Sequence, residues 1–507
     1  MKTYHTIKTL TLGGITMFSL ASCSLDYEPL SEPSEITQGG QTETSTAVLK
    51  DKAAADAQLK SLYELFRNRQ EHTHLDYLLI GDSHSDNAYA GTTGAEVVPY
   101  ETNSIDASNS VLSRDWNRYL EDIAKANVLI NGVEQLKENG QISETEYHSY
   151  KAQGEIFRAL MMFRMARLWG SFPVITTIAK TITSDNINEV YPTYYPPRKT
   201  PKECYEQIIA DLTDAEQYAP DNDNSDRTKM TKTVAQAMLA KVYAEKEVQD
   251  YDKVIAYADK VMNTTGVELE DSYETLWGYD ETAIDCMKRN TKEGILEVHW
   301  SGGGNWETWM YGRQLDNWDY YFTWAKWITP SRDIINDFDK EGDEVRKNQA
   351  IVYYACTWSN YYPASNYPFM YKLRSSYNNI YWVRLADIIL MKAEAEAYKG
   401  NLAESAKLVN QIRKRAKLKD LTSDKTGSKE SMIEAVLHER RLELAFEGER
   451  WFDLCRNNKV EQYLNGIDSR DSGRIRQVRQ FDSNSYLLPI PQTALDQNTN
   501  LEQNPGY

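Results

Sequence analysis

The chain has 507 residues, with 57 Lys and Arg against 75 Asp and Glu, which gives a formal net charge of −18 at pH 7. Hydrophobic residues make up 41% of it and the mean hydropathy is −0.64, a composition that excludes a bundle of membrane spans. The acidic balance argues against a surface built to bind phosphates, so we expect no nucleic-acid partner. The unusual feature is a count of 34 Tyr and 12 Trp against 11 Phe, more rings with polar edges than a core requires.

Residues 1–22 have the pattern of a bacterial export signal. This stretch contains Lys2 and Lys8 near its start and no acidic residue. Its apolar run at 10–20 is too short to span a bilayer. The run ends in Leu-Ala-Ser before Cys23, which is typical of bacterial lipoprotein signal peptides, where the cysteine is diacylated and becomes the new N-terminus. Cys23 is therefore the predicted lipidation site, and its lipid is the predicted contact with the membrane. An ordinary secretory signal with an incidental cysteine is the alternative.

Residues 23–49 predict an acidic, flexible tether. After Cys23 this stretch holds five acids and no Lys or Arg among Ser, Thr, Gly and Pro, so it has too little apolar surface to fold. Its acids resemble the surface-export signal of Bacteroidetes lipoproteins, and a linker with chance charges is the equal alternative. The other four cysteines are far apart without CxxC spacing, so neither a zinc site nor a dense disulfide framework is expected, although one or two bridges stay open.

Most of the remaining chain has apolar residues spaced three and four apart, which predicts amphipathic helices. The clearest helix start is Thr200-Pro201, because Thr is a favoured N-cap and Pro fits the first helical turn. Helix pairs with alanines where they would touch are typical of tetratricopeptide-type repeats, although no strict period is kept. The chain is predicted to be mainly α, with helices over 53–67, 150–169, 231–247, 251–262, 382–399, 402–417 and 431–447.

The middle of the chain has a different composition. Residues 263–381 are rich in Trp, Tyr, Gly and Asn, show little helical periodicity and contain one predicted strand at 294–300. Long loops on a helical scaffold are common places for binding groups. The predicted organisation is an N-terminal helical part (50–262), a loop-rich binding insertion (263–381) and a C-terminal helical part (382–507), with 50–507 as one compact unit.

Several sequence blocks occur in an order that belongs to a known family. The most specific is ERRLELAFEGERWFDL at 439–454, whose charges are spaced to pair along one helix and so to hold a scaffold. The others are FRA at 157–159, LWGSFP at 168–173, TP at 200–201 with Tyr205 and Ile208, RLAD at 384–387, AEA at 393–395, NQIRKRA at 410–416, LPIP at 488–491 and NLEQNPGY at 500–507. Together they resemble the SusD/RagB family of nutrient-binding outer-membrane lipoproteins, of the Bacteroidetes starch-utilisation type.

This resemblance implies a fold, a location and a function. Family members are surface lipoproteins without catalytic activity or cofactor that bind a nutrient, most often a glycan. They sit as a lid on a SusC-like TonB-dependent transporter, which imports the captured molecule. The resemblance thus implies a SusD-like fold and a lipid-anchored protein of the cell outer membrane that faces the exterior. A peptide-capturing RagB-type lid and a surface lipoprotein hydrolase are the alternatives.

Sugar recognition requires flat aromatic faces together with planar polar groups, which points to one segment. Half of the tryptophans lie within 300–327, after three glycines at 302–304, and tyrosines are interleaved with them. Trp327 is assigned to the core because it adjoins Thr329-Pro330, a predicted helix start. For each other ring, packing beneath the loops is the equal alternative, and the acidic balance favours a neutral oligosaccharide as ligand. The predicted ligand-binding residues here are Trp306, Trp309, Tyr311, Arg313, Trp318, Tyr320, Tyr321 and Trp324.

Two further segments are candidates for the binding site. In the Gly/Ser/Thr-rich stretch 77–100, which resembles the family's loop near the ligand, the predicted ligand-binding residues are Asp82, Asp86, Asn87 and Tyr89. The weaker candidate is the tyrosine-rich stretch 353–381, which contains Trp358, Tyr361, Tyr362 and Tyr367. Contact with the transporter is an equal interpretation of that stretch.

Three other patterns imitate catalytic or metal sites. LIGDSHSD at 79–86 resembles the nucleophile block of GDSL esterases, but the oxyanion and base blocks of that mechanism are missing. His72 and His74 would share one strand face, as in a metal site, yet no third ligand is assured. Residues 221–226 resemble the start of an EF-hand loop that lacks its glycine and its bidentate acid. We therefore expect neither an enzyme nor a metal site.

Overall fold

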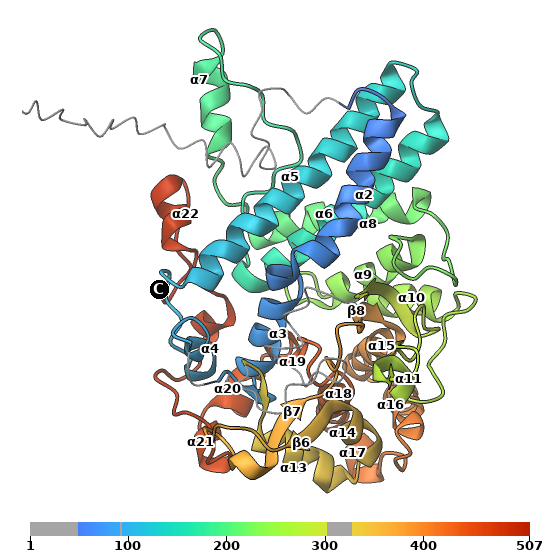
Figure 1. Cartoon of the computed structure of the whole chain (residues 1–507), viewed down its shortest axis with the longest axis vertical. Coiled ribbons are helices and arrows are strands. Elements are labelled where there is room, and N and C mark those ends of the chain that lie inside the picture. The colour runs from blue at the N-terminus through green and yellow to red at the C-terminus, as the bar shows by residue number, and fades with distance from the viewer. Residues whose placement is uncertain (1–48, 92–93, 302–326) are drawn as a thin grey trace, which may run out of the picture.

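The computed structural model describes residues 49–91, 94–301 and 327–507. Its N-terminal part is a row of long helices in which each helix packs on the next one in the row (Figure 1). Four of them were predicted from their apolar spacing, one was predicted from its start at Thr200-Pro201, and one was not predicted. The helices are α2 (Lys52–Asn68), α5 (Ser110–Glu138), α6 (Glu144–Trp169), α8 (Pro201–Tyr218), α9 (Lys232–Ala244) and α10 (Tyr251–Met262).

Polar caps define the starts of most of these helices. The predicted start at Thr200 is confirmed: its hydroxyl accepts from the backbone N–H of Glu203, and the Glu203 carboxylate accepts from the backbone N–H of Thr200. Ser143 forms the same capping box at the start of α6. At the other end of α6, Gly170 has a φ of 73°, a conformation that glycine adopts without strain.

The C-terminal part continues the helical layer, and one of its helices packs on both parts. That helix, α15 (Leu385–Lys399), packs on α9 and α10 of the N-terminal part and on α16 and α18 of its own part. The prediction of a mainly α fold is thereby confirmed. The remaining helices are α16 (Leu402–Arg415), α17 (Ser423–Thr426), α18 (Lys429–Glu443), α19 (Arg450–Arg456), α20 (Val460–Leu464), α21 (Ile467–Arg470), the 3₁₀ turn η5 (Ser483–Tyr486) and α22 (Gln492–Gln497).

The middle region adds short strands and helices, and the strands of the described residues form two-stranded antiparallel sheets. The predicted strand at 294–300 is confirmed as β4 (Gly294–His299), which pairs with β8 (Asn379–Arg384). The other pairs are β1 (Ala88–Tyr89) with β5 (Thr329–Pro330), β2 (Tyr279–Asp280) with β3 (Asp285–Cys286), and β6 (Ile351–Tyr354) with β7 (Tyr367–Met370). The helices and turns of this region are α11 (Glu274–Trp277), α13 (Arg332–Glu341), α14 (Glu344–Ala350) and η4 (Ala364–Asn366).

Three predicted boundaries are wrong for identifiable reasons. The helix predicted from residue 382 begins at Leu385, because the preceding residues are held in β8 by their pairing with β4. The helix predicted at Thr329-Pro330 begins at Arg332, with Ser331 as its N-cap, because Thr329 and Pro330 pair with β1. The block 439–454 is not one helix, since φ values of 61° at Phe446 and 81° at Gly448 separate α18 from α19.

Three of the sequence blocks meet in space at the end of α6. The backbone N–H of Leu488 donates to the carbonyl of Leu168 over 2.8 Å, and the indole Nε1 of Trp169 donates to the carbonyl of Pro489 over 3.1 Å. The amide of Asn504 donates to the carbonyls of Trp169 and Leu488. The C-terminal tail is therefore fastened to the exit of α6 by backbone-directed hydrogen bonds.

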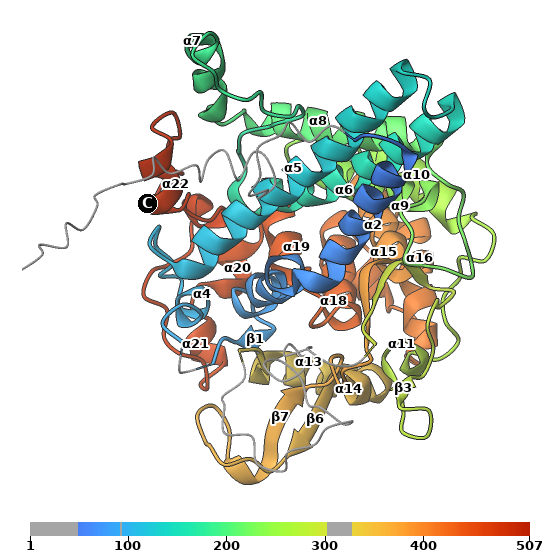
Figure 2. The same ribbon diagram turned by 45° about the horizontal axis from the view of Figure 1, so that its top comes forward.

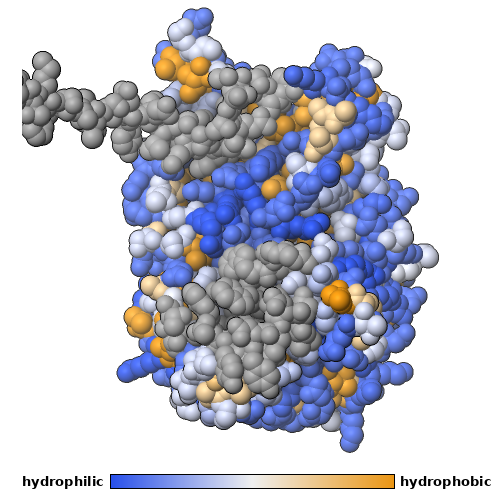
Figure 3. Space-filling model, viewed as in Figure 1, coloured by the Kyte–Doolittle hydropathy of each residue, from blue (hydrophilic) through white to orange (hydrophobic). Residues whose placement is uncertain are grey.

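The hairpin of β6 and β7 lies with α13 and α14 at the end of the molecule opposite α7 (Ile187–Val190), as Figures 1 and 2 agree. The described part of the face in Figure 3 is mainly hydrophilic, with apolar side chains in small groups. None of the helices in the described ranges is long and apolar enough to cross a membrane. The remaining short elements are η1 (Glu71–Leu75), α3 (Asp76–Leu78), η2 (Leu79–Ser83), α4 (Val98–Thr102) and η3 (Tyr191–Tyr194).

Candidate functional site

The predicted aromatic ligand residues between 306 and 324 lie outside the described residues, but both ends of their segment are placed. At one end, the Ser301 hydroxyl accepts a hydrogen bond of 3.3 Å from Arg67, the side chain near the end of α2. At the other end, the carbonyl of Trp327 accepts one of 3.4 Å from Ser83 in η2. Trp327 packs against the core, as predicted. The candidate site is therefore the region between α2 and η2 to which these ends are attached.

Asp82, one of the predicted ligand residues, is fully buried and joins two turns, namely η2 and the turn between α18 and α19. Its carboxylate accepts from the Asn87 amide at 2.8 Å and from the backbone N–H groups of Phe446 and Gly448 at 3.1 and 2.9 Å. Burial raises the pKa of Asp82 to about 7, while these N–H donors act in the opposite direction. A Cβ atom on Gly81 would lie 2.2 Å from the carbonyl oxygen of Gly448, so the two turns are in backbone contact.

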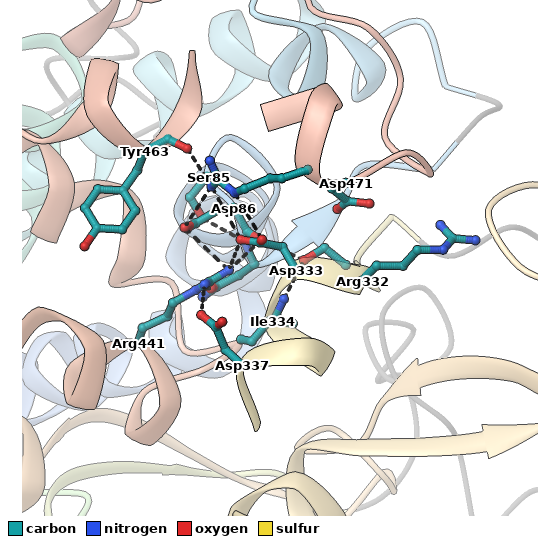
Figure 4. A network of polar contacts seen from close by, with 12 residues as sticks. Ser85, Asp86, Arg332, Asp333, Ile334, Asp337, Arg441, Tyr463 and Asp471 are labelled. Carbon is teal, nitrogen blue, oxygen red and sulfur yellow. Dashed lines mark hydrogen bonds and ion pairs between the residues drawn. The ribbon is translucent and has the colours of Figure 1, made fainter. Parts of the chain in front are cut away.

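Asp86 is the centre of a buried ion-pair network, which Figure 4 shows. Arg450 donates to both of its carboxylate oxygens, at 2.8 and 2.9 Å, and Arg441 lies 3.4 Å away. Arg441 also pairs with Asp333 and Asp337 on α13. Burial acts to raise the pKa of Asp86, but the two guanidinium groups more than offset it and hold that pKa well below its usual range. We call these five residues the Asp86 network.

Tyr89 is also fully buried, and it belongs to an aromatic stack. Its ring lies against that of Tyr361, with centroids 4.3 Å apart and an interplanar angle of 21°. The Tyr89 hydroxyl donates to Asp471 over 2.6 Å, and the Tyr361 hydroxyl donates to Glu101 over 2.8 Å. The Arg332 guanidinium lies over the neighbouring ring of Tyr362 at 4.2 Å.

The four predicted residues Asp82, Asp86, Asn87 and Tyr89 therefore lie in the interior, with no exposed surface for a ligand to touch. Their hydrogen bonds and ion pairs tie the turn after η2 to α13, α18 and α19. The sequence suggested an exposed loop because this stretch is polar and rich in small residues. The partners of these four residues outside this stretch lie far away in the chain, so no local sequence pattern predicted that they would be buried.

The stretch 353–381 divides into buried and exposed aromatic residues. Tyr367 and Phe369 form a small core on one side of the β6–β7 hairpin, against which Trp358 and Tyr362 pack. Tyr353 and Tyr354, by contrast, are 38% and 36% exposed. Most rings of this stretch thus stabilise the hairpin, and these two are the ones that it presents to its surroundings.

A cavity near Trp300 brings together aromatic rings that no sequence pattern connected. Tyr77 from α3, Trp277 from α11, and Tyr381 and Trp382 from β8 line it. The edge of the predicted aromatic segment adjoins it, because Trp300 lies edge-to-face with His74, another lining residue, at 5.8 Å. We call this the aromatic cavity; its other lining residues are Leu78, Arg164, Lys372, Leu373, Ile380, Phe446, Glu447 and Glu449.

Charged groups surround the aromatic cavity. The Arg164 guanidinium lies 3.9 Å from the ring centre of Tyr77 and 3.7 Å from that of Trp382. Lys372 lies 2.6 Å from Glu447 and 4.6 Å from the ring centre of Trp277. Burial lowers the pKa of Lys372 to about 8, although the Glu447 carboxylate acts in the opposite direction.

The patterns that imitate other sites have ordinary structural roles. His72 and His74 lie in the helical turn η1 rather than on a strand, and Nε2 of His72 is 2.9 Å from Asp122. The Ser83 hydroxyl is directed to a backbone carbonyl. In the part of the chain that the structure describes, no group of three His, Cys, Asp or Glu side chains is arranged to hold a metal ion, and the four cysteines are unpaired.

The fold and the site define a class: a helical scaffold with a cavity lined by aromatic rings and a few charged groups, which is the arrangement of a ligand-binding site. The family model described as "SusD family" matches residues 216–507, and one described as "Starch-binding associating with outer membrane" matches residues 41–244. The chain belongs to the SusD family. The predicted membership of this glycan-binding, outer-membrane-associated family is thus confirmed.

Individual relatives agree with this assignment. The chain is 27% identical over 441 residues to SusD-like protein P2 of Formosa agariphila, with 79% of this chain and 81% of that protein covered. Among solved structures, it is similar to a SusD superfamily protein from Bacteroides vulgatus, with a TM-score of 0.73, 21% identity and coverage of 91% and 100%. A laminarin-binding SusD-like protein gives a TM-score of 0.69 at 23% identity, with coverage of 90% and 100%.

Proposed function

We propose that this protein captures an oligosaccharide at the cell surface and delivers it to a SusC-like TonB-dependent transporter. Family membership supports glycan binding and association with the outer membrane. In this proposal Cys23 carries the lipid anchor, the acidic tether lets the folded part face the exterior, and the protein binds its cargo without catalysing a reaction.

The observation that carries the proposal is the aromatic cavity near Trp300. Its lining residue His74 contacts Trp300, shortly before the segment with Trp306, Trp309 and Trp324 leaves the described structure. Aromatic faces stack on the apolar faces of sugar rings, and planar polar groups such as guanidinium and amide bind the hydroxyls. We propose that the segment 306–324 supplies the sugar-stacking rings, and that the buried residues Asp82 to Tyr89 support this site without touching the ligand.

Affinity electrophoresis against a panel of polysaccharides tests the proposal. We expect the mature protein to be retarded by at least one polysaccharide, and the variants Trp306→Ala and Trp309→Ala to lose that retardation. Tyr191→Ala is the control, because it removes a ring that is 51% exposed near α7, away from the candidate site.

Other outcomes distinguish the alternatives. Absence of retardation, together with peptide binding in calorimetry, would support a peptide-capturing lid instead. Release of reducing sugar by the purified protein would contradict a purely binding function. Only modest affinity is expected, because shallow aromatic platforms bury little area and sugar hydroxyls must be desolvated.

A further inference from the structure

The polar groups that line the aromatic cavity indicate the chemistry of what it binds. This inference rests on the proposed function and concerns the same region. Two features matter: a buried cation without a carboxylate partner among the described residues, and buried N–H groups without a described acceptor.

The cation is Arg164 on α6, which is 8% exposed. It donates to the backbone carbonyl of Thr73 and lies between the rings of Tyr77 and Trp382. Within the described ranges, no carboxylate lies within ion-pair distance of its guanidinium. A buried charge without a counter-charge is costly, so this position favours an anion from outside the chain.

The carboxylates of the cavity do not fill this role, because cations already neutralise them. Glu447 pairs with Lys372 and Arg384, at 2.6 and 2.7 Å. Glu449 pairs with Arg167 and Lys241, both at 3.0 Å. Neither carboxylate is directed to Arg164.

Two lining residues also have buried nitrogen atoms without a hydrogen-bond partner among the described residues. These are Nε1 of Trp277, whose side chain is 5% exposed, and Nε2 of His74. The indole nitrogen can only donate. Nε1 of Trp300, which lies against His74, is likewise without a partner in the described structure.

We propose that the aromatic cavity binds the carboxylate of an acidic sugar, so that the captured oligosaccharide contains uronic acid residues. The carboxylate pairs with Arg164 and accepts a hydrogen bond from the N–H of Trp277. The cavity volume of about 30 Å³ leaves room for a small group such as a carboxylate. This choice differs from the neutral ligand that the net charge of the chain suggested. Local groups, not net charge, decide what a pocket binds.

Calorimetry with matched pairs of oligosaccharides tests this proposal. The probes are galacturonate, glucuronate and mannuronate oligosaccharides and the methyl esters of the same compounds, which keep the sugar skeleton and remove the charge. We expect the mature protein to bind at least one free acid about tenfold or more tightly than its ester, since hydrogen bonds to charged groups contribute about this much.

Variants locate the effect. Arg164→Gln should reduce the preference for the acid to less than about twofold, and Trp277→Phe, which keeps a ring and removes the N–H, should reduce it by part of this amount. Arg476→Gln, which removes an exposed guanidinium, is the control for net charge and should keep the preference of the wild type. If Arg164→Gln does not fold, Trp277→Phe and the comparison of acid with ester in the unmodified protein still decide the question.

The possible failures can be told apart. Equal affinity for acid and ester, or binding of neutral glycans only, would overturn the carboxylate proposal, leave glycan capture in place and indicate that the cavity holds water. Failure to bind any glycan would contradict the proposed function and this inference together.

Discussion

Asp86 and Arg450 are separated by 364 positions in the chain, yet they form a bidentate ion pair in the interior of the protein. Because Arg441 binds the same aspartate, one carboxylate joins the turn after η2 to both α18 and α19. Long-range ion pairs of this kind hold the framework around the candidate site, and their burial makes them sensitive to the loss of a single partner.

The first prediction concerns this ion pair. Asp86→Ala should lower the free energy of unfolding by about 3–5 kcal/mol, because it leaves Arg450 charged and buried without a described carboxylate partner. Urea unfolding measures the change. The double variant Asp86→Ala/Arg450→Met should lose less than the single variant. Asp337→Ala, which removes a partly exposed partner of Arg441, should cost only about 1 kcal/mol, and an equally small effect of Asp86→Ala would contradict the prediction.

The second prediction concerns the contact between the two turns. Gly81→Ala should destabilise the protein by about 2–3 kcal/mol, because the new methyl group would meet the backbone of Gly448, which can give way only if a turn shifts. Gly132→Ala on α5 is the matched control, since its obstacle is the side chain of Leu49, which can move. Thermal unfolding of the two variants compares them, and equal melting temperatures would show that the backbone contact is unimportant.

The third prediction concerns pH. Burial lowers the pKa of His84 to about 4, while its Nδ1 lies 2.5 Å from the carbonyl of Tyr100. Between pH 6.5 and 4 the unfolded chain therefore binds this proton more readily than the folded protein does. The contribution of His84 is complete above pH 6.5 and is lost as the pH falls to 4, by an amount on the order of 3 kcal/mol.

Unfolding free energies measured between pH 7 and pH 4 check this dependence. His84→Gln should flatten the decline over this range, whereas His148→Gln, in which a partly exposed imidazole is removed, should keep the slope of the wild type. An unchanged slope in His84→Gln would assign the acid sensitivity to other groups.

The fourth prediction concerns the anchor. Cys23→Ser should move the protein from the detergent-rich to the aqueous phase in a detergent partition experiment on expressing cells, because acyl chains on that cysteine would provide the hydrophobic attachment. Cys356→Ser is the control and should remain in the detergent phase. Retention of Cys23→Ser with the detergent would point to attachment by other means.

The sequence predicted elements well where the signal was local. The helix 251–262 is found with the predicted bounds, because the apolar residues that define it in the sequence are the ones that it buries. The long helix α5 was not predicted, since Asp115, Asp122 and Asn127 are buried on it and interrupt its apolar spacing. Only their tertiary partners explain these polar positions, as for Asp122, which pairs with His72.

The candidate site was predictable in kind but not in position. An excess of aromatic residues indicated a binding surface, yet the aromatic cavity draws Tyr77, Trp277 and Trp382 from distant parts of the chain. Likewise, Asp86 and Tyr89 have polar side chains of the kind that bind ligands. Only the fold shows that Asp86 is paired with Arg450 and that the ring of Tyr89 is stacked on that of Tyr361. Sequence spacing reports neighbours along a helix or strand, and contacts across hundreds of residues leave no such pattern.

The attachment of the C-terminal tail to the end of α6 has a consequence for the order of events during synthesis. The carbonyl of Trp169 is bound by Asn504, and the indole of Trp169 by Pro489, so α6 lacks these contacts until residues 489–504 have been made. These hydrogen bonds therefore form only late in synthesis, after the rest of the helical layer has been made.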